Sequence, residues 1–411
     1  MAALPQPPTI LSFEEARHVV EGQAAQVRPR TKETIDLLAS LGRVLAEPIT
    51  ADREFPPFRR AMRDGYALRA ADLASLPATL EVVGEIKAGA PPETLPHELG
   101  AGQAAAIMTG APAPNGADAV VMVEYTSLSG KRVTVSRGVG SGDNIVAAGS
   151  EARQGQVLLH HGTRMDYGAI ALAASVGLER LSVYRRPEVA ILSTGDEIVE
   201  IGEHPGPHQI RNSNSYSLAA QVQEAGGVPK MLGIARDEAA HLRGLIEQGL
   251  KHDLLLLTGG VSMGRYDIVE QVLAELGAEF FFTGAQIQPG RPVVFGRVRQ
   301  HYFFGLPGNP ISTMVTFELF AMPMLQALAG MAARELCFVH SKLKSEIKTK
   351  TGLKRFLPAL LSGEFEQAEV ELAGWHGSGD VAAMARSNCY IVIPPDRERI
   401  AAGEWVAILM R

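Results

Sequence analysis

Three glycine-rich loops carry residue types that could bind an anionic ligand, and each follows a short apolar run. They are Ser193-Thr194-Gly195-Asp196-Glu197, Thr258-Gly259-Gly260-Val261-Ser262-Met263-Gly264 and Gly305-Leu306-Pro307-Gly308-Asn309-Pro310. Glycine lets the backbone approach a ligand closely, and a helix that follows such a loop offers unpaired N–H groups at its N-terminus. One loop alone is about as compatible with an ordinary strand-to-helix turn. Three at one sheet edge favour a binding site for a phosphorylated substrate.

Three carboxylates, Glu197, Asp237 and Asp267, follow different apolar runs and could converge on one pocket. Converging carboxylates suit a hard cation such as Mg²⁺, or proton transfer when a pKa is tuned. Each also has a structural interpretation. Because Asp is a favoured helix N-cap, spacing alone favours capping over chemistry for Asp237, and Asp267 could cap a helix in the same way.

Other chemistries find little support in the sequence. The two cysteines, Cys337 and Cys389, form no CxxC pair, and the eleven histidines show no metal-ligand spacing. A disulfide framework and a structural zinc site are therefore not expected. No serine lies in a G-x-S-x-G elbow, so a hydrolase triad is unsupported. Pattern alone leaves residues 62–67 and 107–112 as an ordinary turn and a strand end with a hairpin.

Charge and hydropathy exclude some partners. The net charge of −6 gives no support for binding to nucleic acid or to anionic lipid. Residues 1–8 lack the basic start and apolar run of a signal peptide. The longest largely apolar stretch, residues 320–333, contains Pro323 and is too short to span a bilayer. The sequence therefore predicts a cytoplasmic protein that acts on small molecules.

The elements that must position these residues fall into several domains, because 411 residues exceed one hydrophobic core. Ser12 and Glu15 have capping-box spacing and predict a helix that begins near Phe13. A second helix is predicted over residues 32–45. Short β-type runs follow between residues 55 and 142, at 80–83, 104–108, 119–123 and 132–136. An alanine-rich helix over 170–177 could return to pack on the first region.

From residue 188 the pattern alternates between strand and helix. Strands are predicted at 189–192, 228–234, 254–257, 280–282 and 302–304, and helices at 215–225, 242–250, 269–276 and 311–330. This alternation predicts a parallel α/β/α sheet, with the three loops at the carboxyl ends of its strands. The tail from about residue 337 returns to β-type runs, at 390–393 and 405–409, which predict a small sandwich or barrel.

Eight segments resemble the MoeA family in order and spacing, over nearly the whole chain. They include the three loops and Pro56-Pro57-Phe58, Arg63-Asp64-Gly65-Tyr66-Ala67, Ile107-Met108-Thr109-Gly110-Ala111-Pro112, Gly116-Ala117-Asp118-Ala119-Val120-Val121 and Pro289-Gly290-Arg291-Pro292. The C-terminal region of gephyrin, a eukaryotic scaffold and enzyme, is related to this family.

The resemblance implies a multidomain α/β plus β fold in an elongated homodimer. Domain I would comprise residues 1–52 and 143–183, β-rich domain II residues 53–142, α/β/α molybdopterin-binding domain III residues 184–331, and a small β-barrel, domain IV, residues 332–411. The active site would lie between domain III of one subunit and domain II of the other. The implied reaction converts adenylyl-molybdopterin and molybdate into molybdenum cofactor and AMP. A divalent cation such as Mg²⁺ would assist, and a molybdopterin adenylyltransferase is a possible partner.

The resemblance also implies roles for single residues. Catalytic positions would be Asp64, Thr109, Glu197, Asp237 and Asp267, of which Glu197 and Asp267 would bind the metal. Substrate would contact Glu151, Gly259, Gly260, Ser262, Arg291, Pro307, Gly308, Asn309, Pro310 and Ser378. Arg291 would pair with an anionic oxygen, because a guanidinium presents a fork of donors.

Some positions depart from the family pattern. Gln288 and Gly284 stand where the family often has lysines, which bears on oxyanion binding and on the choice between molybdate and tungstate. Gly149-Ser150-Glu151 replaces a Gly-Glu-Asp sequence, so the carboxylate at Glu151 has one extra methylene.

Two other classes of function compete with a metal-inserting transferase. One is a weakly active scaffold or carrier that holds molybdopterin or a partner, or a paralogue that uses tungstate. The other class shares only the α/β domain, namely the preceding adenylyltransferase or a nucleotide-amide hydrolase. The presence of Asp64, Thr109, Glu197, Asp237 and Asp267 argues against loss of activity. Release of AMP that depends on molybdate would separate the transferase from both.

Overall fold

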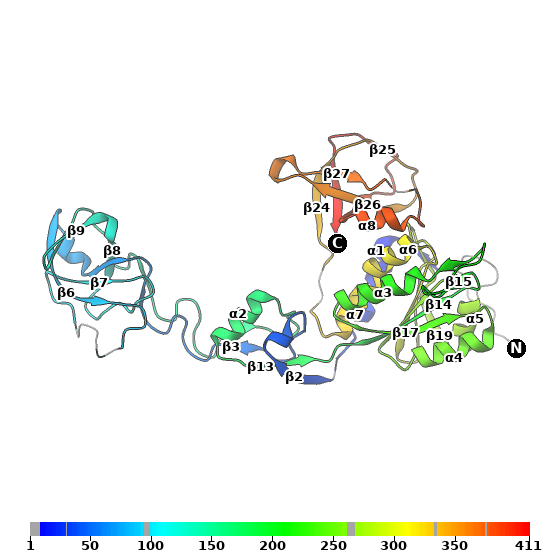
Figure 1. Cartoon of the computed structure of the whole chain (residues 1–411), viewed down its shortest axis with the longest axis horizontal. Coiled ribbons are helices and arrows are strands. Elements are labelled where there is room, and N and C mark those ends of the chain that lie inside the picture. The colour runs from blue at the N-terminus through cyan, green and yellow to red at the C-terminus, as the bar shows by residue number, and fades with distance from the viewer. Residues whose placement is uncertain are drawn as a thin grey trace.

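The computed structural model describes residues 9–29, 31–91, 93, 98–260, 268–332, 335–374 and 376–411. The chain is elongated (Figure 1). A β-rich part, called here the distal sheet, lies at one end. A small linking region connects it to an α/β domain at the other end, and a C-terminal barrel lies beside that domain. The predicted domain limits remain a prediction, and these four names refer to the elements described below.

The α/β domain is built on a six-stranded sheet in the order β17-β14-β18-β23-β22-β19. The strands are β14 (Glu188–Thr194), β17 (Val228–Ala235), β18 (Leu254–Thr258), β19 (Ala278–Phe282), β22 (Val294–Val298) and β23 (His301–Leu306). The prediction of a parallel sheet is confirmed for β17, β14, β18 and β23. The edge differs, because β22 and β19 are antiparallel. A two-residue connection between β22 and β23 is too short for a parallel crossover.

Helices cover both faces of this sheet. They are α3 (Ser213–Glu224), α4 (Ala239–Gly249), α5 (Ile268–Glu275), α6 (Pro310–Thr316) and α7 (Met322–Leu328), with a π-helical segment, Phe317–Ala321, between the last two. One face packs on α4 and α5, and the other on α3, α6 and α7. The N-terminal helix α1 (Phe13–Ala24) joins the second layer and packs against α7. The predicted capping box is confirmed, since Ser12 and Glu15 exchange both bonds.

The helical stretch Pro310–Leu328 is long and apolar enough to cross a membrane by length and composition alone. It is mostly buried inside the protein, however, and Phe317 and Phe320 are fully enclosed by the core between α1 and the sheet. The stretch is therefore best explained as the core helix of the α/β domain.

The linking region corrects one prediction. Residues 32–45 do not form a helix. They form β2 (Lys32–Asp36) and a 3₁₀ turn, Leu38–Ser40. Strand β2 contains β-branched Thr34 and Ile35 and pairs with β13 (Arg180–Tyr184), so a distant partner overrides the local helical pattern. The predicted alanine-rich helix is confirmed as α2 (Tyr167–Ser175), and its buried face packs on Leu45 and Ile49.

The distal sheet confirms the predicted β-type runs. Its six strands lie in the order β8-β5-β7-β6-β10-β9. Their bounds are β5 (Gly65–Leu68), β6 (Ala78–Ile86), β7 (Gln103–Ile107), β8 (Ala119–Met122), β9 (Thr126–Ser129) and β10 (Arg132–Val135), with 3₁₀ turns at Ala70–Leu73 and Val123–Tyr125. Short pairs connect it to the linking region, namely β3 (Ile49–Thr50) with β12 (Val157–Leu159) and β4 (Arg60–Ala61) with β11 (Ile145–Val146).

The C-terminal tail forms the predicted barrel. Strand β26 pairs at one end with β27 and at the other with β28, which closes a ring in the order β26-β27-β24-β30-β28. The bounds are β24 (Phe338–Leu343), β26 (Lys354–Ser362), β27 (Glu369–Leu372), β28 (Cys389–Ile393) and β30 (Trp405–Met410), with helix α8 (Val381–Arg386) and a 3₁₀ turn, Phe365–Gln367.

Several short strand pairs complete the structure, and one of them joins the α/β domain to the barrel. Strand β21 (Ile287–Gln288) leaves the α/β domain and pairs with β26 of the barrel. The other short pairs are β1 (Ile10–Leu11) with β20 (Gly284–Ala285), β15 (Ile198–Val199) with β16 (Ile210–Arg211), and β25 (Ile347–Lys348) with β29 (Arg399–Ile400). The pairing of β21 with β26 attaches the barrel to the edge of the α/β domain.

Candidate functional site

The three glycine-rich loops meet at one edge of the α/β sheet. Strands β14, β18 and β23 are parallel neighbours, so the loops that follow them leave the sheet side by side. The Gly259 N–H donates to the carbonyl of Leu306 at 3.3 Å. A Cβ built on Gly308 would lie 3.5 Å from the Cα of Gly259. The predicted convergence is therefore confirmed for the described residues, while Ser262 and Asp267 lie outside them.

Gly259 and Gly260 allow the loop after β18 to pack closely against the end of β14. Their φ angles are +86° and +64°, in the left-handed region that favours glycine. A Cβ on Gly259 would lie 2.4 Å from the Thr194 carbonyl oxygen, and one on Gly260 would lie 2.6 Å from the Thr194 hydroxyl. Both positions therefore require glycine, and the loop brings its backbone to the surface without a side chain in the way.

The turn Pro307-Gly308-Asn309-Pro310 is held from below by Asn214, near the start of α3. The Asn214 amide nitrogen donates to the Gly308 carbonyl at 2.7 Å and to the Thr258 hydroxyl at 3.0 Å. Asn309 is the N-cap of α6, and Pro310 occupies its first turn, where a proline loses no helical hydrogen bond. The turn therefore presents a fixed backbone and a helix N-terminus to the cleft.

Two buried oxygen atoms on this floor have no hydrogen-bond partner within the described part of the chain. They are the Thr194 hydroxyl and the amide oxygen of Asn214. The Gly308 carbonyl can only accept, so the Asn214 nitrogen must face it and the oxygen is left free. Buried polar groups are normally satisfied, so these two atoms are exceptions to the usual pairing. Sequence reasoning missed Asn214, because its partners Thr258 and Gly308 lie far along the chain.

An acidic group flanks the first loop. Asp196 and Glu197 follow β14, and Asp237 follows its neighbour β17. The Asp237 N–H donates to an Asp196 carboxylate oxygen at 3.4 Å. The pKa of Asp237 is raised, first by desolvation from the surrounding protein and then by the charges of Asp196 and Glu197. The convergence of Glu197 and Asp237 is confirmed, and Asp196 is a third member that sequence reasoning had not singled out.

The capping interpretation of Asp237 is wrong. The N-cap of α4 is Glu238, and its side chain makes no capping hydrogen bond. Asp237 lies one residue earlier, beside the other acids rather than on the helix end, so a structural role as cap does not explain it.

The acidic group has the hard oxygen donors that Mg²⁺ prefers. Within the described ranges, however, no three or more His, Cys, Asp or Glu side chains are arranged to hold a metal ion. The charges of Asp196 and Glu197 add to desolvation in raising the pKa of Asp237, because the three carboxylates repel one another. A cation would relieve that repulsion.

The second pair of predicted catalytic residues lies on the distal sheet. Asp64 directly precedes β5 and Thr109 follows β7, and the antiparallel pairing of these strands places the two side by side. The Thr109 N–H and hydroxyl both donate to one Asp64 carboxylate oxygen, at 2.6 and 2.7 Å. These bonds hold the pKa of Asp64 below its usual range, the backbone bond first. Both residues are exposed.

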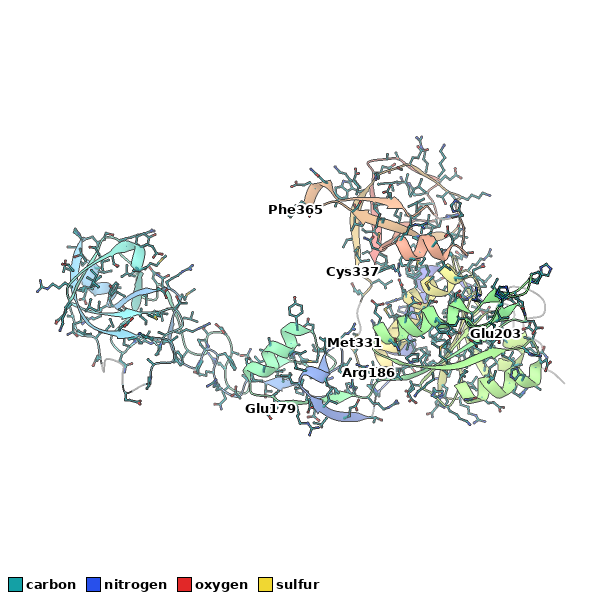
Figure 2. All side chains as sticks on the ribbon, in the orientation of Figure 1. Glu179, Arg186, Glu203, Met331, Cys337 and Phe365 are labelled. Carbon is teal, nitrogen blue, oxygen red and sulfur yellow. The ribbon has the colours of Figure 1, made fainter. Side chains whose placement is uncertain are left out.

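The two carboxylate sites are not brought together within one chain. The distal sheet lies at the far end of the linking region from the α/β domain (Figure 1), and the side chains drawn in Figure 2 leave the two ends apart. Glu151 is also remote from the glycine-rich loops, near the distal sheet, where its carboxylate accepts from Arg60 at 2.8 Å.

A seam between the α/β domain and the barrel holds the remaining predicted residues. The carbonyl of Ser378 accepts from the N–H of Ile311, in the first turn of α6. The loop that contains Arg291 packs on the same helix, since a Cβ on Gly290 would lie 2.4 Å from Thr316. Arg291 itself is exposed. Ser378 and Pro310 are therefore neighbours, although they come from different domains.

Sequence reasoning missed Arg355 at this seam. It is paired in register with Gln288, which stands where the family often has a lysine. The residue is only 6% exposed, and its guanidinium donates to the Leu353 carbonyl at 3.0 Å. Burial lowers its pKa. A charged residue inside an otherwise apolar strand was the available signal, because arginine is seldom buried without a partner.

Profiles of known families match three segments of the chain. Residues 11–177 match the MoeA N-terminal region (domain I and II), and residues 190–327 match a probable molybdopterin binding domain. Residues 340–410 match the MoeA C-terminal region (domain IV). Together these matches extend over most of the sequence.

Similar proteins agree over nearly the full length. A molybdopterin molybdenumtransferase from Nostoc sp. is 37% identical over 390 residues, which cover 92% of this chain and 88% of the relative. One from Bacillus subtilis is 36% identical over 388 residues, covering 92% and 89%. The solved structure of the molybdopterin biosynthesis moeA protein from Pyrococcus horikoshii OT3 is 29% identical, with a TM-score of 0.79, and covers 98% of this chain and 100% of that one.

Proposed function

The chain belongs to the MoeA family, and we propose that it is a molybdopterin molybdenumtransferase of molybdenum cofactor biosynthesis. Its substrates are adenylyl-molybdopterin and molybdate, and its products are molybdenum cofactor and AMP. The observation that carries the proposal is the edge of the α/β sheet, where the glycine-rich turns after β14, β18 and β23 lie side by side and the carboxylates of Asp196, Glu197 and Asp237 flank them.

This edge suits a phosphorylated pterin. Gly259 and Gly260 expose backbone where a phosphate can approach closely. The turn at Gly308 and Asn309 completes the floor. Ser262 belongs to the same proposed set by resemblance alone.

A divalent cation such as Mg²⁺ fits the acidic group. Glu197, together with Asp196, Asp237 and the family position Asp267, would hold it through carboxylate oxygens. When bound, the cation neutralises charge between the carboxylates and the substrate phosphates. Desolvation and the charges of Asp196 and Glu197 raise the pKa of Asp237, so it takes up a proton more readily than an ordinary Asp.

The oxyanion belongs at the seam between the α/β domain and the barrel. Arg355 is buried there, and no described residue offers it a carboxylate partner. The loop that contains Arg291 and residues 376–380, called here the Ser378 loop, both pack against α6. A guanidinium donates several N–H groups to a tetrahedral oxyanion. Because Gln288 and Gly284 are neutral, we expect Arg355 and Arg291 to supply the positive charge.

The catalytic pair on the distal sheet requires a second copy of the chain. Asp64 and Thr109 lie too far along the molecule to reach the glycine-rich loops of their own chain. A homodimer in which the distal sheet of one subunit faces the α/β edge of the other would complete the site. Asp64, held as a carboxylate by Thr109, would then orient a substrate group.

The test is AMP release from adenylyl-molybdopterin by the purified protein with Mg²⁺, with and without molybdate, beside a Glu197→Gln variant. The expected result is AMP release that requires molybdate and falls by about a hundredfold in the variant. Tungstate in a parallel reaction reports the choice of oxyanion. Substrate binding without AMP release under either oxyanion would overturn the proposal in favour of a scaffold or carrier.

A further inference from the structure

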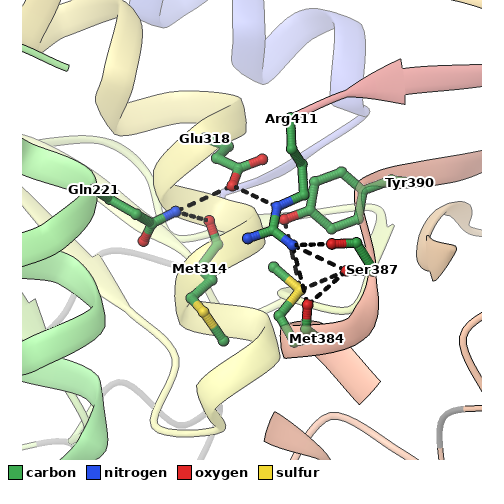
Figure 3. A network of polar contacts seen from close by, with 7 residues as sticks. All are labelled: Gln221, Met314, Glu318, Met384, Ser387, Tyr390 and Arg411. Carbon is green, nitrogen blue, oxygen red and sulfur yellow. Dashed lines mark hydrogen bonds and ion pairs between the residues drawn. The ribbon is translucent and has the colours of Figure 1, made fainter. Parts of the chain in front are cut away.

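A buried polar network lies where the barrel meets the core helix of the α/β domain (Figure 3). At its centre is Glu318, in the π-helical segment Phe317–Ala321. The amide nitrogen of Gln221, on α3, donates to a Glu318 carboxylate oxygen at 3.2 Å and to the Met314 carbonyl at 3.1 Å. The guanidinium of Arg411 approaches the same carboxylate, with its Nε at 3.7 Å. Glu318 is therefore tied both to α3 and to the barrel.

Arg411 continues the network into the barrel. Its Nη1 donates to the carbonyls of Met384 and Ser387 at 3.1 and 3.0 Å, and to the Ser387 hydroxyl at 3.0 Å. These acceptors lie at the C-terminal end of α8. A cation is favourable there, because the last carbonyls of a helix lack intrahelical partners. Arg411 thus joins the end of α8 to Glu318.

The other end of α8 is fastened to the same core helix. Asp380 caps α8 through the Ala383 N–H at 3.0 Å. Two residues earlier, the Ser378 carbonyl accepts from the Ile311 N–H at 3.0 Å. The core helix therefore holds α8 at two points, at Ile311 beside the substrate turn and at Glu318 about two turns further along.

A purely structural contact would not require this chemistry. Burying the Glu318 carboxylate beside the partly exposed Arg411 is costly, and a well-packed apolar residue often serves as well. The carboxylate of Glu318 lies in a π-helical segment, an irregularity that is frequent at functional sites. Because both ends of α8 are attached to the core helix, the Glu318–Arg411 pair also fixes the position of the loop that contains Ser378.

We propose that Glu318 and Arg411 are positioning residues, which hold α8 and the Ser378 loop against the Pro307–Pro310 turn so that the loop closes over the substrate. The inference rests on the proposed function, since it assigns Ser378 to the substrate cleft. Neither residue touches substrate. Both act through α8.

The groups around Glu318 decide how pH affects the pair. Arg411 from the barrel and Gln221 from α3 favour its charged form, as does Tyr390 from β28, while Glu224 from α3 opposes it. Burial outweighs them and raises the pKa of Glu318 to about 7. Burial also raises the pKa of Tyr390, which stays neutral. The closed seam therefore binds a proton more tightly than an open, hydrated one, and it loosens as the pH rises through about 7.

The experiment compares Arg411→Met, Glu318→Gln and the double variant with the full-length wild type. Arg411→Met should raise the KM and the dissociation constant for adenylyl-molybdopterin about tenfold with little change in kcat, because the loop that binds substrate is no longer held. Arg411→Met alone leaves a buried charge unpaired and should lower the midpoint of denaturation. The double variant removes both charges and should recover that midpoint without recovering KM.

Amide hydrogen exchange adds a readout that needs no substrate. Residues 376–388 should exchange faster in Arg411→Met, and in the wild type faster at pH 8 than at pH 6 after correction for intrinsic rates. Glu318→Gln should remove that pH difference. The matched control is Glu404→Gln, which breaks the exposed Arg397–Glu404 pair of the same barrel and should leave KM and exchange unchanged.

Wild-type KM and dissociation constant in Arg411→Met would overturn the inference, and so would a double variant whose KM recovers together with its stability. Absence of AMP release by the wild type would instead overturn the proposed function. In that case the dissociation constants and exchange rates still decide whether the pair holds the Ser378 loop over bound substrate.

Discussion

The distal sheet and the edge of the α/β domain each present a carboxylate, and the two carboxylates are tuned in opposite directions. On the distal sheet, two hydrogen bonds from Thr109 hold the pKa of Asp64 below its usual range. At the α/β edge, desolvation and the neighbours Asp196 and Glu197 raise the pKa of Asp237. Asp64 is thus fixed as an anion, whereas Asp237 is ready to bind a proton or a cation. The proposed site uses both carboxylates, which lie at opposite ends of one chain.

The two regions also differ in what holds them. The distal pair consists of exposed side chains on neighbouring strands, so a substitution there changes chemistry more than folding. At the α/β edge, the absence of side chains at Gly259 and Gly260 lets the backbone pack closely against the buried end of β14. A substitution there changes the shape of the floor itself. The difference predicts which variants lose activity alone and which lose stability as well.

The largest effect is expected from Gly259→Val. A side chain at a φ of +86° costs about 1–2 kcal/mol and would meet the Thr194 carbonyl. We expect activity to fall by about a hundredfold, together with a lower midpoint in chemical denaturation. The matched control is Gly244→Ala on α4, where a Cβ meets no atom within 4 Å, and where alanine should add about 0.5–1 kcal/mol of stability without loss of activity. A fully active Gly259→Val protein would contradict the close packing of Gly259 against Thr194 as a requirement for activity.

A smaller effect is expected from Thr109→Val on the distal sheet. The variant loses the hydroxyl bond to Asp64 and keeps the backbone bond, so the pKa of Asp64 should rise toward its ordinary value. The acidic limb of the pH–activity profile should move to higher pH, with activity about tenfold lower on that limb. Denaturation should be unchanged. A Thr109→Ser variant retains the hydroxyl and should keep the wild-type profile, and an equal shift in both variants would rule out the hydrogen bond as the cause.

The smallest effect is expected from Asp237→Asn on stability. An acid whose pKa is raised in the folded state binds its proton more tightly there, so wild-type stability falls as the pH rises from the ordinary Asp range through the raised pKa. The variant should escape that loss. Because Asp237 is exposed, the gain at neutral pH should stay within about 0.5 kcal/mol. Urea denaturation at pH 5 and pH 8 measures it, and Asp36→Asn, which loses an Arg180 partner instead, should show no gain.

The sequence predicted those parts of the fold that local chemistry decides. The capping box of α1 and the apolar strands β14 and β18 are set by neighbouring residues, and all three were predicted. Residues 32–36 were predicted wrongly as helix, because their partner β13 lies far along the chain and no local pattern reveals the pairing. The antiparallel edge of the α/β sheet was missed for a different reason, because residues 294–298 were not predicted as a strand and the short hairpin to β23 therefore was not recognised.

The candidate site was predictable to a lesser degree. The convergence of the three loops followed from the rule that parallel strands share a carboxyl edge. The choice of Asp64 and Thr109 came only from resemblance, since pattern alone gives an ordinary turn and a strand end with a hairpin, and their hydrogen bond was not predicted. Asn214, Asp196 and Arg355 were not singled out, because their roles depend on burial and on partners that a single sequence does not show. The role of Asp237 was misread as a cap for the same reason.

The central claim is that the distal sheet of one subunit completes the α/β edge of another. The direct measurement is complementation between two inactive proteins, Asp64→Ala and Glu197→Ala, mixed in equal amounts under conditions that allow subunit exchange. In a dimer of one chain of each kind, both defects fall in one of the two shared sites, and the other site is intact. Half of the dimers would be mixed in this way, so the mixture should recover about a quarter of the wild-type rate of molybdate-dependent AMP release. No recovery, with exchange shown by differently tagged chains, would contradict the claim.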